Sequence, residues 1–313
     1  MSRSESDTRR RRSVEGQTRP TPMDASPGGR RIEDAIRRRT AKGESALIPF
    51  FTAGDPDAGT TLARVDVAVR AGADVLELGL PFSDPVADGP VLQAASQRAL
   101  KGGGGRKVTL EIAKEVRARY PDLPIVILTY LNPIFHAGYG VFGRLARESG
   151  VDGVLVPDLS LEESPVVREA FHGAGVALIP FAAPTSGQKR LEKMARVAEG
   201  FVYSVARLGV TGAASTLATS AQAVAEAVRA VTAVPVAIGF GVGSAEAARQ
   251  AARYADAVIV GSALAANSGD ASRPLGLDGV HSLLMAMRAA MDAEPVAVPG
   301  QARTVPDVGR EGR

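Results

Sequence analysis

One carboxylate lies inside an apolar stretch of the sequence, at Glu77. Its neighbours Leu76 and Leu78 would share the outer face of a β-strand, so Glu77 would point to the opposite, interior face. Burial disfavours the ionised carboxyl group and raises its pKa, which makes Glu77 a candidate general acid or base near neutral pH. The alternative is a structural glutamate that bonds to the backbone or to an arginine distant in sequence.

A second candidate carboxylate, Asp88, lies in the segment that follows this predicted strand. Three prolines and one glycine between residues 81 and 90 predict a loop of defined shape. The loop could turn Asp88 toward the same site as Glu77. An aspartate before Gly-Pro is also common in turns and at helix starts. The spacing alone therefore supports a functional and a structural role for Asp88 equally.

Glycine-rich segments follow the last three predicted strands. They are residues 209–212, residues 239–244, and Gly261 with Ser262. Glycines let backbone N–H groups approach an anion closely, and a serine hydroxyl adds a further hydrogen bond. Tight turns would explain any one of these segments, but the three together favour a phosphate site.

The composition excludes several other kinds of catalytic chemistry. The chain contains no cysteine, which excludes disulfides, thiolate nucleophiles, zinc knuckles and iron–sulfur clusters. Its three histidines are not spaced to share a metal ion, and none of its six lysines lies on a predicted strand, where a Schiff base would need one. The residues present favour carboxylate acid–base chemistry on a phosphorylated substrate.

Eight short apolar runs must position these residues. They are rich in Val, Ile, Leu or Phe and too short for helices, which is typical of strands buried on both faces. The runs are residues 46–52, 74–80, 124–130, 153–157, 176–181, 201–206, 235–240 and 257–261. The helices expected between them include residues 61–71, 110–120, 161–172, 187–198, 221–232 and 244–253. Gly72 and Gly173 stand where two of these helices would end in a left-handed cap.

This alternation predicts a (β/α)₈ TIM barrel with an extra N-terminal helix over residues 31–42 that closes its bottom. A doubly wound open sheet is the alternative, but no linker divides the chain into two halves. In a barrel, active-site residues lie at the carboxyl ends of the strands. Glu77, the Asp88 loop and the glycine-rich segments would then share one face.

The positive charge is confined to one end of the chain. The net charge is +3, but residues 1–31 carry eight arginines and four acidic residues, which leaves 29 basic and 30 acidic residues in the rest. We expect a disordered Arg-rich extension over residues 1–30, a catalytic barrel over 31–292 and a flexible C-terminal tail over 293–313. The near-neutral barrel argues against nucleic acid, and no apolar run is long enough for a membrane span. No apolar segment follows the arginines, so we expect a cytoplasmic protein.

Residues 76–90 (LELGLPFSDPVADGP) closely resemble the signature of the tryptophan synthase alpha chain family. Residues 48–56 (IPFFTAGDP), 131–133 (LNP) and 209–212 (GVTG) resemble its other motifs in the same order, and the resemblance covers about residues 31–292. It implies a lyase of tryptophan biosynthesis that cleaves indole-3-glycerol phosphate to indole and glyceraldehyde 3-phosphate. It also implies an α₂β₂ complex in which the β subunit holds pyridoxal phosphate and this chain holds no cofactor.

The resemblance implies a role for each matching residue. Glu77 would protonate indole C3 and help remove the glycerol hydroxyl proton, Asp88 would bind the indole N–H, and Tyr203 matches the active-site tyrosine. The implied substrate contacts are Phe50, Leu128, Thr211 and Phe240 around the indole, with Phe240 also beside the phosphate, and Gly212, Gly241, Gly261 and Ser262 at the phosphate. Asp84, Pro85 and Asn132 match loops that face the β subunit in the family.

Three positions depart from the family pattern. Ser160 replaces a usual proline, Ala206 replaces a commoner serine, and the loop after Gly212 lacks a charged or amide residue. The alternatives to an α subunit are a free-standing lyase, a non-catalytic barrel that activates a β subunit, and a sugar-phosphate isomerase. The presence of both Glu77 and Asp88 argues against the non-catalytic barrel, and an isomerase leaves the apolar pocket unexplained.

Overall fold

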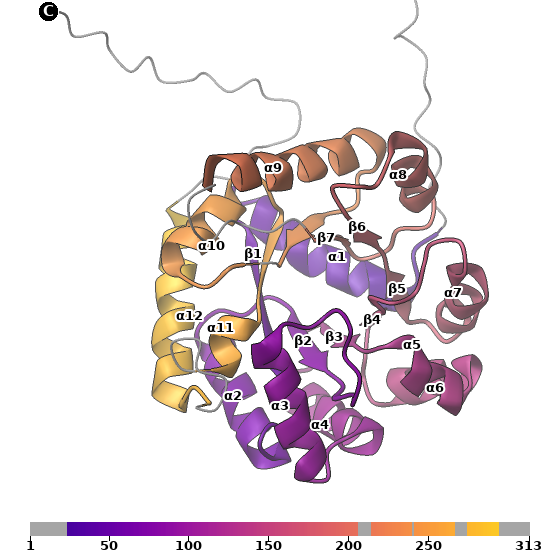
Figure 1. Ribbon diagram of the computed structural model, residues 1–313, viewed down its shortest axis with the longest axis vertical. Helices are drawn as coiled ribbons and strands as arrows, with labels where there is room; N and C mark the ends of the chain where they lie inside the picture. The colour runs from indigo at the N-terminus through magenta and orange to yellow at the C-terminus, as the bar shows by residue number, and fades with distance from the viewer. Residues whose placement is uncertain (1–23, 206–213, 240, 267–273, 294–313) are drawn as a thin grey trace, which may run out of the picture.

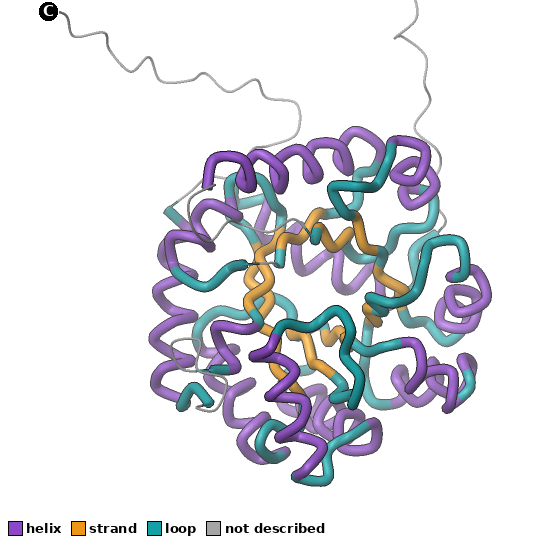
Figure 2. The backbone as a smooth tube through the Cα atoms, viewed as in Figure 1, coloured by secondary structure: helices purple, strands orange, loops and turns teal. Residues whose placement is uncertain are grey.

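A closed ring of parallel strands surrounded by helices forms the body of the protein (Figures 1 and 2). The computed structural model describes residues 24–205, 214–239, 241–266 and 274–293. Within these ranges nine strands pair in the order β5-β4-β3-β2-β1-β9-β8-β7-β6, and the predicted barrel is confirmed. The strands are β1 (Ala46–Thr52), β2 (Leu76–Gly79), β3 (Ile125–Leu128), β4 (Gly153–Leu155), β5 (Ala177–Ile179), β6 (Phe181–Ala182), β7 (Val202–Ser204), β8 (Val236–Ile238) and β9 (Ala257–Val260).

The predicted strand over residues 176–181 is two strands. β5 pairs with β4, β6 pairs with β7, and Pro180 lies between them. Proline has no amide hydrogen to donate to a ladder, which explains the break. Because the two end strands of the sheet are consecutive in the chain, the backbone through Pro180 closes the ring. β1 has the predicted bounds, and the remaining strands are one to three residues shorter than predicted.

Helices cover the outside of the ring. They are α2 (Ala58–Arg70), α3 (Pro90–Lys101), α4 (Arg106–Arg119), α5 (Leu131–Ala137), α6 (Tyr139–Glu148), α7 (Ser164–Gly173), α8 (Gln188–Ala195), α9 (Ala214–Val231), α10 (Ala245–Ala252), α11 (Ser262–Ala265) and α12 (Leu277–Asp292). The predicted left-handed cap is present at Gly72, with φ of 88°. The cap predicted at Gly173 is wrong, because Gly173 is the last residue of α7 and the positive φ, 79°, falls at Gly175. In the described ranges no helix is both long and apolar enough to cross a membrane.

The helix α1 (Pro27–Thr40) lies across the bottom of the ring, as the sequence predicts (Figure 1). Its Ile32 and Ile36 are fully buried and join the apolar cluster inside the barrel. It begins earlier than residue 31, because the Ser26 side chain accepts a hydrogen bond from the Gly29 N–H at 3.1 Å and caps it. Residues 27–30, assigned to the disordered extension, therefore belong to α1. The rest of that extension up to residue 23, and residues 294–313 of the tail, lie outside the described residues.

The variant Ile32→Ala is expected to lower the free energy of unfolding by about 2–5 kcal/mol, the usual cost of truncating a buried isoleucine. Ile32 packs so closely on the barrel floor that a methyl group at Gly153 would lie 2.8 Å from its Cδ1 atom. Urea denaturation measures the change. The matched control is Arg38→Ala on the exposed face of the same helix, expected within about 0.5 kcal/mol of the parent. Equal free energies of unfolding for the two variants would contradict the packing of α1 against the bottom of the barrel.

Candidate active site

Glu77 lies on β2 and points into the barrel, as predicted. Its register partners are Phe50 on β1 and Val126 on β3, and both belong to the interior apolar cluster. Side chains of paired residues share a face of the sheet, so the Glu77 carboxyl group faces the same interior. Glu77 is 1% exposed, and its Oε2 atom has no hydrogen-bond partner among the described residues. A buried carboxyl group with a free oxygen is available for proton transfer.

Asp88 lies close enough to Glu77 to change its ionisation. Burial, and then the charge of Asp88, raise the pKa of Glu77 from an ordinary value of 4.5 to about 8. Burial raises the pKa of Asp88 to about 6, against a hydrogen bond from Tyr130 that lowers it. Near pH 7 the pair therefore holds one proton, with Glu77 as the acid and Asp88 as the anion. The arrangement unites a proton donor and a fixed negative charge.

Tyr130 holds the Asp88 loop in place and was missed by the sequence analysis. It lies two residues after the end of β3, immediately before α5, and is 2% exposed. Its hydroxyl oxygen accepts a hydrogen bond from the Ala87 N–H at 3.1 Å and donates one to the Asp88 carboxylate. Burial and the Asp88 charge raise the pKa of Tyr130, which keeps the hydroxyl protonated. The available signal was a tyrosine at the carboxyl end of a predicted strand.

Tyr203 lies on β7 across the interior from these groups. It is 6% exposed, and burial, with the charges of Glu77 and Asp88, raises its pKa well above 10. Its ring lies beside the ring of Phe181, with centroids 5.0 Å apart. Its hydroxyl reaches the end of β8, where a methyl group at Gly239 would lie 2.1 Å from the Tyr203 oxygen. The structure therefore brings Glu77, Asp88 and Tyr203 to one place.

An apolar wall adjoins the carboxylates. Phe50 belongs to the interior cluster, and Leu128 packs against it. Both lie towards the carboxyl ends of their strands, β1 and β3. The Phe50 ring lies so close to β2 that a methyl group at Gly79 would be 2.5 Å from its Cζ atom. This wall suits a flat apolar group held above Glu77. Thr211, Gly212 and Phe240 lie outside the described residues.

The remaining candidate residues follow β8 and β9 at the same end of the barrel. Gly241 has φ of 81°, a conformation that favours glycine, and Gly261 precedes α11, which begins at the exposed Ser262. The next helix after Gly241, α10, begins after Ser244, whose side chain accepts a hydrogen bond from the Ala247 N–H. These segments present backbone N–H groups at the mouth of the barrel, which suits an anion. Over the described ranges, no group of three or more His, Cys, Asp or Glu side chains is arranged to hold a metal ion.

Comparisons with known proteins find relatives in a single family. The family model described as "Tryptophan synthase alpha chain" matches residues 36–276. The tryptophan synthase alpha chain of Carboxydothermus hydrogenoformans is 44% identical over 234 residues, which cover 75% of this chain and 87% of the relative. That of Laribacter hongkongensis is 43% identical over 263 residues, 84% of this chain and 99% of the relative.

Similar solved structures belong to the same family. Tryptophan synthase subunit alpha from Legionella pneumophila superposes with a TM-score of 0.76 at 34% identity, covering 84% of this chain and 98% of that one. A chain of Mycobacterium tuberculosis tryptophan synthase superposes with a TM-score of 0.75 at 33% identity, covering 86% and 99%.

Proposed function

The chain belongs to the tryptophan synthase alpha chain family and is a lyase that cleaves indole-3-glycerol phosphate, and we propose that Glu77, Asp88 and Tyr203 form its catalytic site. The observation that carries this assignment is the buried Glu77 carboxyl group, which keeps its proton at neutral pH beside an ionised Asp88. A carboxylic acid with a pKa near the working pH is suited to give and take a proton within one reaction cycle.

The cleavage proceeds by two proton transfers through Glu77. Glu77 first donates its proton to C3 of the indole ring, and the positive charge that develops spreads to the ring nitrogen. Asp88 accepts a hydrogen bond from the indole N–H and stabilises that charge. The Glu77 carboxylate then takes the proton of the hydroxyl group on the adjacent glycerol carbon. That carbon becomes the aldehyde of glyceraldehyde 3-phosphate, the carbon–carbon bond breaks, and its electron pair returns to the ring as indole leaves.

The other matching residues would bind the substrate. Phe50 and Leu128 form the apolar wall beside Glu77, and Thr211 and Phe240 join them by the family match. The residues proposed for the phosphate are Gly212, Gly241, Gly261 and Ser262. Both proton transfers in this reaction are to or from Glu77, so we propose that this chain needs no cofactor. As a step of tryptophan biosynthesis, the reaction is proposed to take place in the cytoplasm.

We further propose that a tryptophan synthase β subunit, which would carry pyridoxal phosphate, docks over the mouth of the barrel in an α₂β₂ complex. Two large apolar side chains at this end support a partner. Val86 in the Asp88 loop is 81% exposed and Phe135 on α5 is 67% exposed. The matching residues Asp84, Pro85 and Asn132 lie in the same loop and helix. Apolar groups presented to water beside an active site are typical of a protein interface.

Indole release from indole-3-glycerol phosphate, measured with and without a β subunit, tests the function. Slow release by the chain alone that rises strongly with the β subunit would support the α-subunit assignment. Fast release without a partner would identify a free-standing lyase instead. No release under either condition would contradict the catalytic assignment.

The variant Phe135→Glu is expected to reduce the stimulation by the β subunit at least tenfold while the rate of the isolated chain stays the same. It places a charge in the apolar part of the proposed interface, where it would be desolvated. Met285→Glu on α12 is the matched control, because Met285 is also an exposed apolar side chain, 44% exposed. Equal stimulation of both variants would place the interface elsewhere.

The variant Tyr130→Phe is expected to move the acid limb of the kcat/KM pH profile upward from about 6. Loss of the hydroxyl removes the hydrogen bond that lowers the Asp88 pKa, so Asp88 would take up its proton at a higher pH. The rate at pH 7 should fall about tenfold, because more Asp88 is neutral and its loop loses the contact to Ala87. An unchanged acid limb would show that Tyr130 does not control Asp88.

A further inference from the structure

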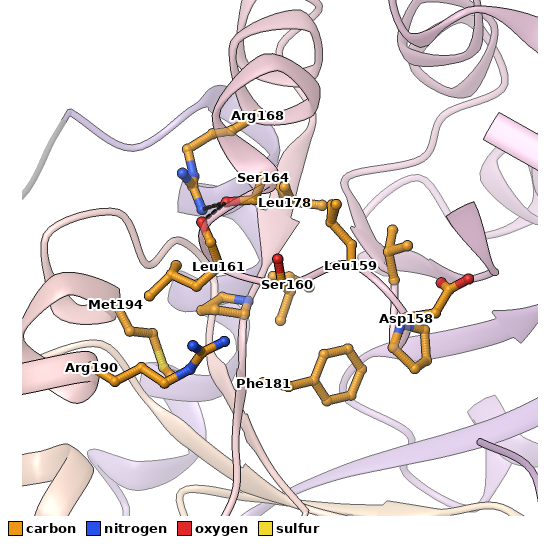
Figure 3. A pocket seen from close by; sticks show the side chains of 14 residues that line it. Asp158, Leu159, Ser160, Leu161, Ser164, Arg168, Leu178, Phe181, Arg190 and Met194 are labelled. Atoms are coloured by element: carbon orange, nitrogen blue, oxygen red, sulfur yellow. Dashed lines mark hydrogen bonds between the residues drawn. The ribbon is translucent and has the colours of Figure 1, made fainter. Parts of the chain in front are cut away.

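A cavity of about 300 Å³ lies beside the barrel, between α7, α8 and the strands β5 and β6 (Figure 3). No residue assigned above to the catalysis or to the substrate lines it. Its lining residues are Val156, Pro157, Asp158, Leu159, Ser160, Leu161, Ser164, Arg168, Leu178, Ile179, Pro180, Phe181, Arg190 and Met194. A volume of this size is at the lower end of the range for small-molecule sites.

Arg168 on α7 gives the cavity a buried positive charge. The side chain is only 8% exposed, and its Nη2 atom donates to the Ser164 hydroxyl at 2.9 Å (Figure 3). Within the described part of the chain, Arg168 forms no ion pair with a carboxylate, and its Nε atom has no hydrogen-bond partner. An arginine stays charged even when buried, and a buried charge without a counter-ion is unfavourable.

The nearest compensating charge is already engaged elsewhere. Burial lowers the pKa of Arg168, and the charge of Glu199 opposes this change. Glu199 accepts a hydrogen bond from the Ser26 N–H at 2.6 Å and lies 3.2 Å from the His172 Nδ1 atom. Its carboxylate is thus used to hold the start of α1. Arg168 therefore keeps an N–H donor, at Nε, that none of the described residues accepts.

Of the three charged side chains in the lining, Arg168 is the only buried one. Arg190 donates to both carboxylate oxygens of Glu162 at 2.8 Å, so its charge is matched. Asp158 lies on the opposite side of the cavity from Arg168, and it accepts a hydrogen bond from the Leu131 N–H (Figure 3). The walls between them are mainly apolar, with side chains that include Leu161, Leu178, Phe181 and Met194.

We propose that this cavity is a second binding site, for a small organic carboxylate. Its negative group would contact the Arg168 guanidinium, which pairs well with planar carboxylates. Its apolar body would lie against Leu178 and Met194, where it displaces water from hydrocarbon walls. Phe181 lines the cavity and also packs on Tyr203, so it is the shared wall between this site and the catalytic one.

Binding of 4-fluorobenzoate to the full chain, followed by ¹⁹F NMR line broadening, tests the proposal. The neutral isostere 4-fluorobenzamide should bind about tenfold more weakly, because it lacks the charge that Arg168 matches. Arg168→Met should weaken benzoate binding by a similar factor, Arg168→Lys should restore part of it, and Arg38→Met is the control without effect. Equal binding of the acid and the amide, or wild-type affinity in Arg168→Met, would overturn the proposal.

A crystal soaked in 4-bromobenzoate locates the probe independently of any Arg168 variant. An anomalous bromine peak inside the cavity supports the site. A peak only in the mouth beside Glu77, or no peak at all, overturns it. The site does not depend on the cleavage reaction, so Glu77→Gln should bind 4-fluorobenzoate as the parent does.

Discussion

Glu77→Gln is expected to lower kcat for cleavage of indole-3-glycerol phosphate about 10³-fold, within the usual contribution of a general acid–base group. Glutamine has nearly the same shape as glutamate but neither donates a proton to carbon nor accepts one from a hydroxyl group. The side chain is buried and its Oε2 atom is unpartnered among the described residues, so the substitution removes little else from the fold. An indole-release assay measures the rate, and KM should change little because the substrate contacts remain.

Glu199→Gln is the matched control for this experiment. Glu199 is also 1% exposed, but it lies at the opposite end of the barrel, where it bonds to the Ser26 N–H at the start of α1. Its variant should lower stability and leave kcat within about twofold of the parent. Retention of more than about a tenth of the parental kcat in Glu77→Gln would show that another group transfers the proton.

Gly239→Ala is expected to cost about 1–3 kcal/mol of stability or more, together with most of the activity. The added methyl group would lie 2.1 Å from the Tyr203 hydroxyl oxygen, 2.6 Å from its Cζ atom and 3.1 Å from the Ile259 Cβ atom. Atoms cannot approach this closely, so the Tyr203 ring or the end of β8 must move. Either movement displaces a side chain that faces the two carboxylates.

The double variant Gly239→Ala/Tyr203→Leu separates this collision from a general defect of β8. Leucine removes both Tyr203 atoms that the methyl group meets, the hydroxyl oxygen and Cζ, so the double variant should be more stable than the sum of the two single changes allows. Gly187→Ala is the control, because a methyl group there meets no atom within 4 Å. Additive changes in unfolding free energy would contradict a direct contact between positions 203 and 239.

The barrel and Glu77 could be predicted because their signals are local. An apolar run with one carboxylate shows which face of the strand is interior, and β1 has the predicted bounds because every residue of the run is buried. The division at Pro180 also has a local cause, since proline cannot donate to a ladder. The start of α1 also has a local signal, because Ser26 caps the helix and Pro27 is in its first turn, although the predicted start was residue 31. The hydrogen bond from the Ser26 N–H to Glu199, 173 positions away, could not be predicted from the local sequence.

The roles of Tyr130 and Arg168 could be recognised only in the three-dimensional structure. Tyr130 acts on Asp88 only because the loop of residues 81–90 folds back over the end of β3. Arg168 lies on a helix, where a charged residue is ordinarily exposed, but it is buried and lines a cavity together with the segment that follows β4. The spacing of Asp88 left its role open, and its proximity to Glu77 and Tyr130 now supports a place in the site.

The pKa of Glu77 in the folded protein decides whether this residue can act as the acid of the cleavage reaction. Carboxyl ¹³C NMR of protein labelled at glutamate, with the Glu77 signal assigned by its loss in Glu77→Gln, follows the titration. We predict a pKa of about 8 in the parent. In Asp88→Asn we predict a lower pKa that remains above 4.5, because the raising charge is removed and the burial stays. A parental pKa at or below 4.5 would rule out Glu77 as the general acid, since it would then have no proton to donate at neutral pH.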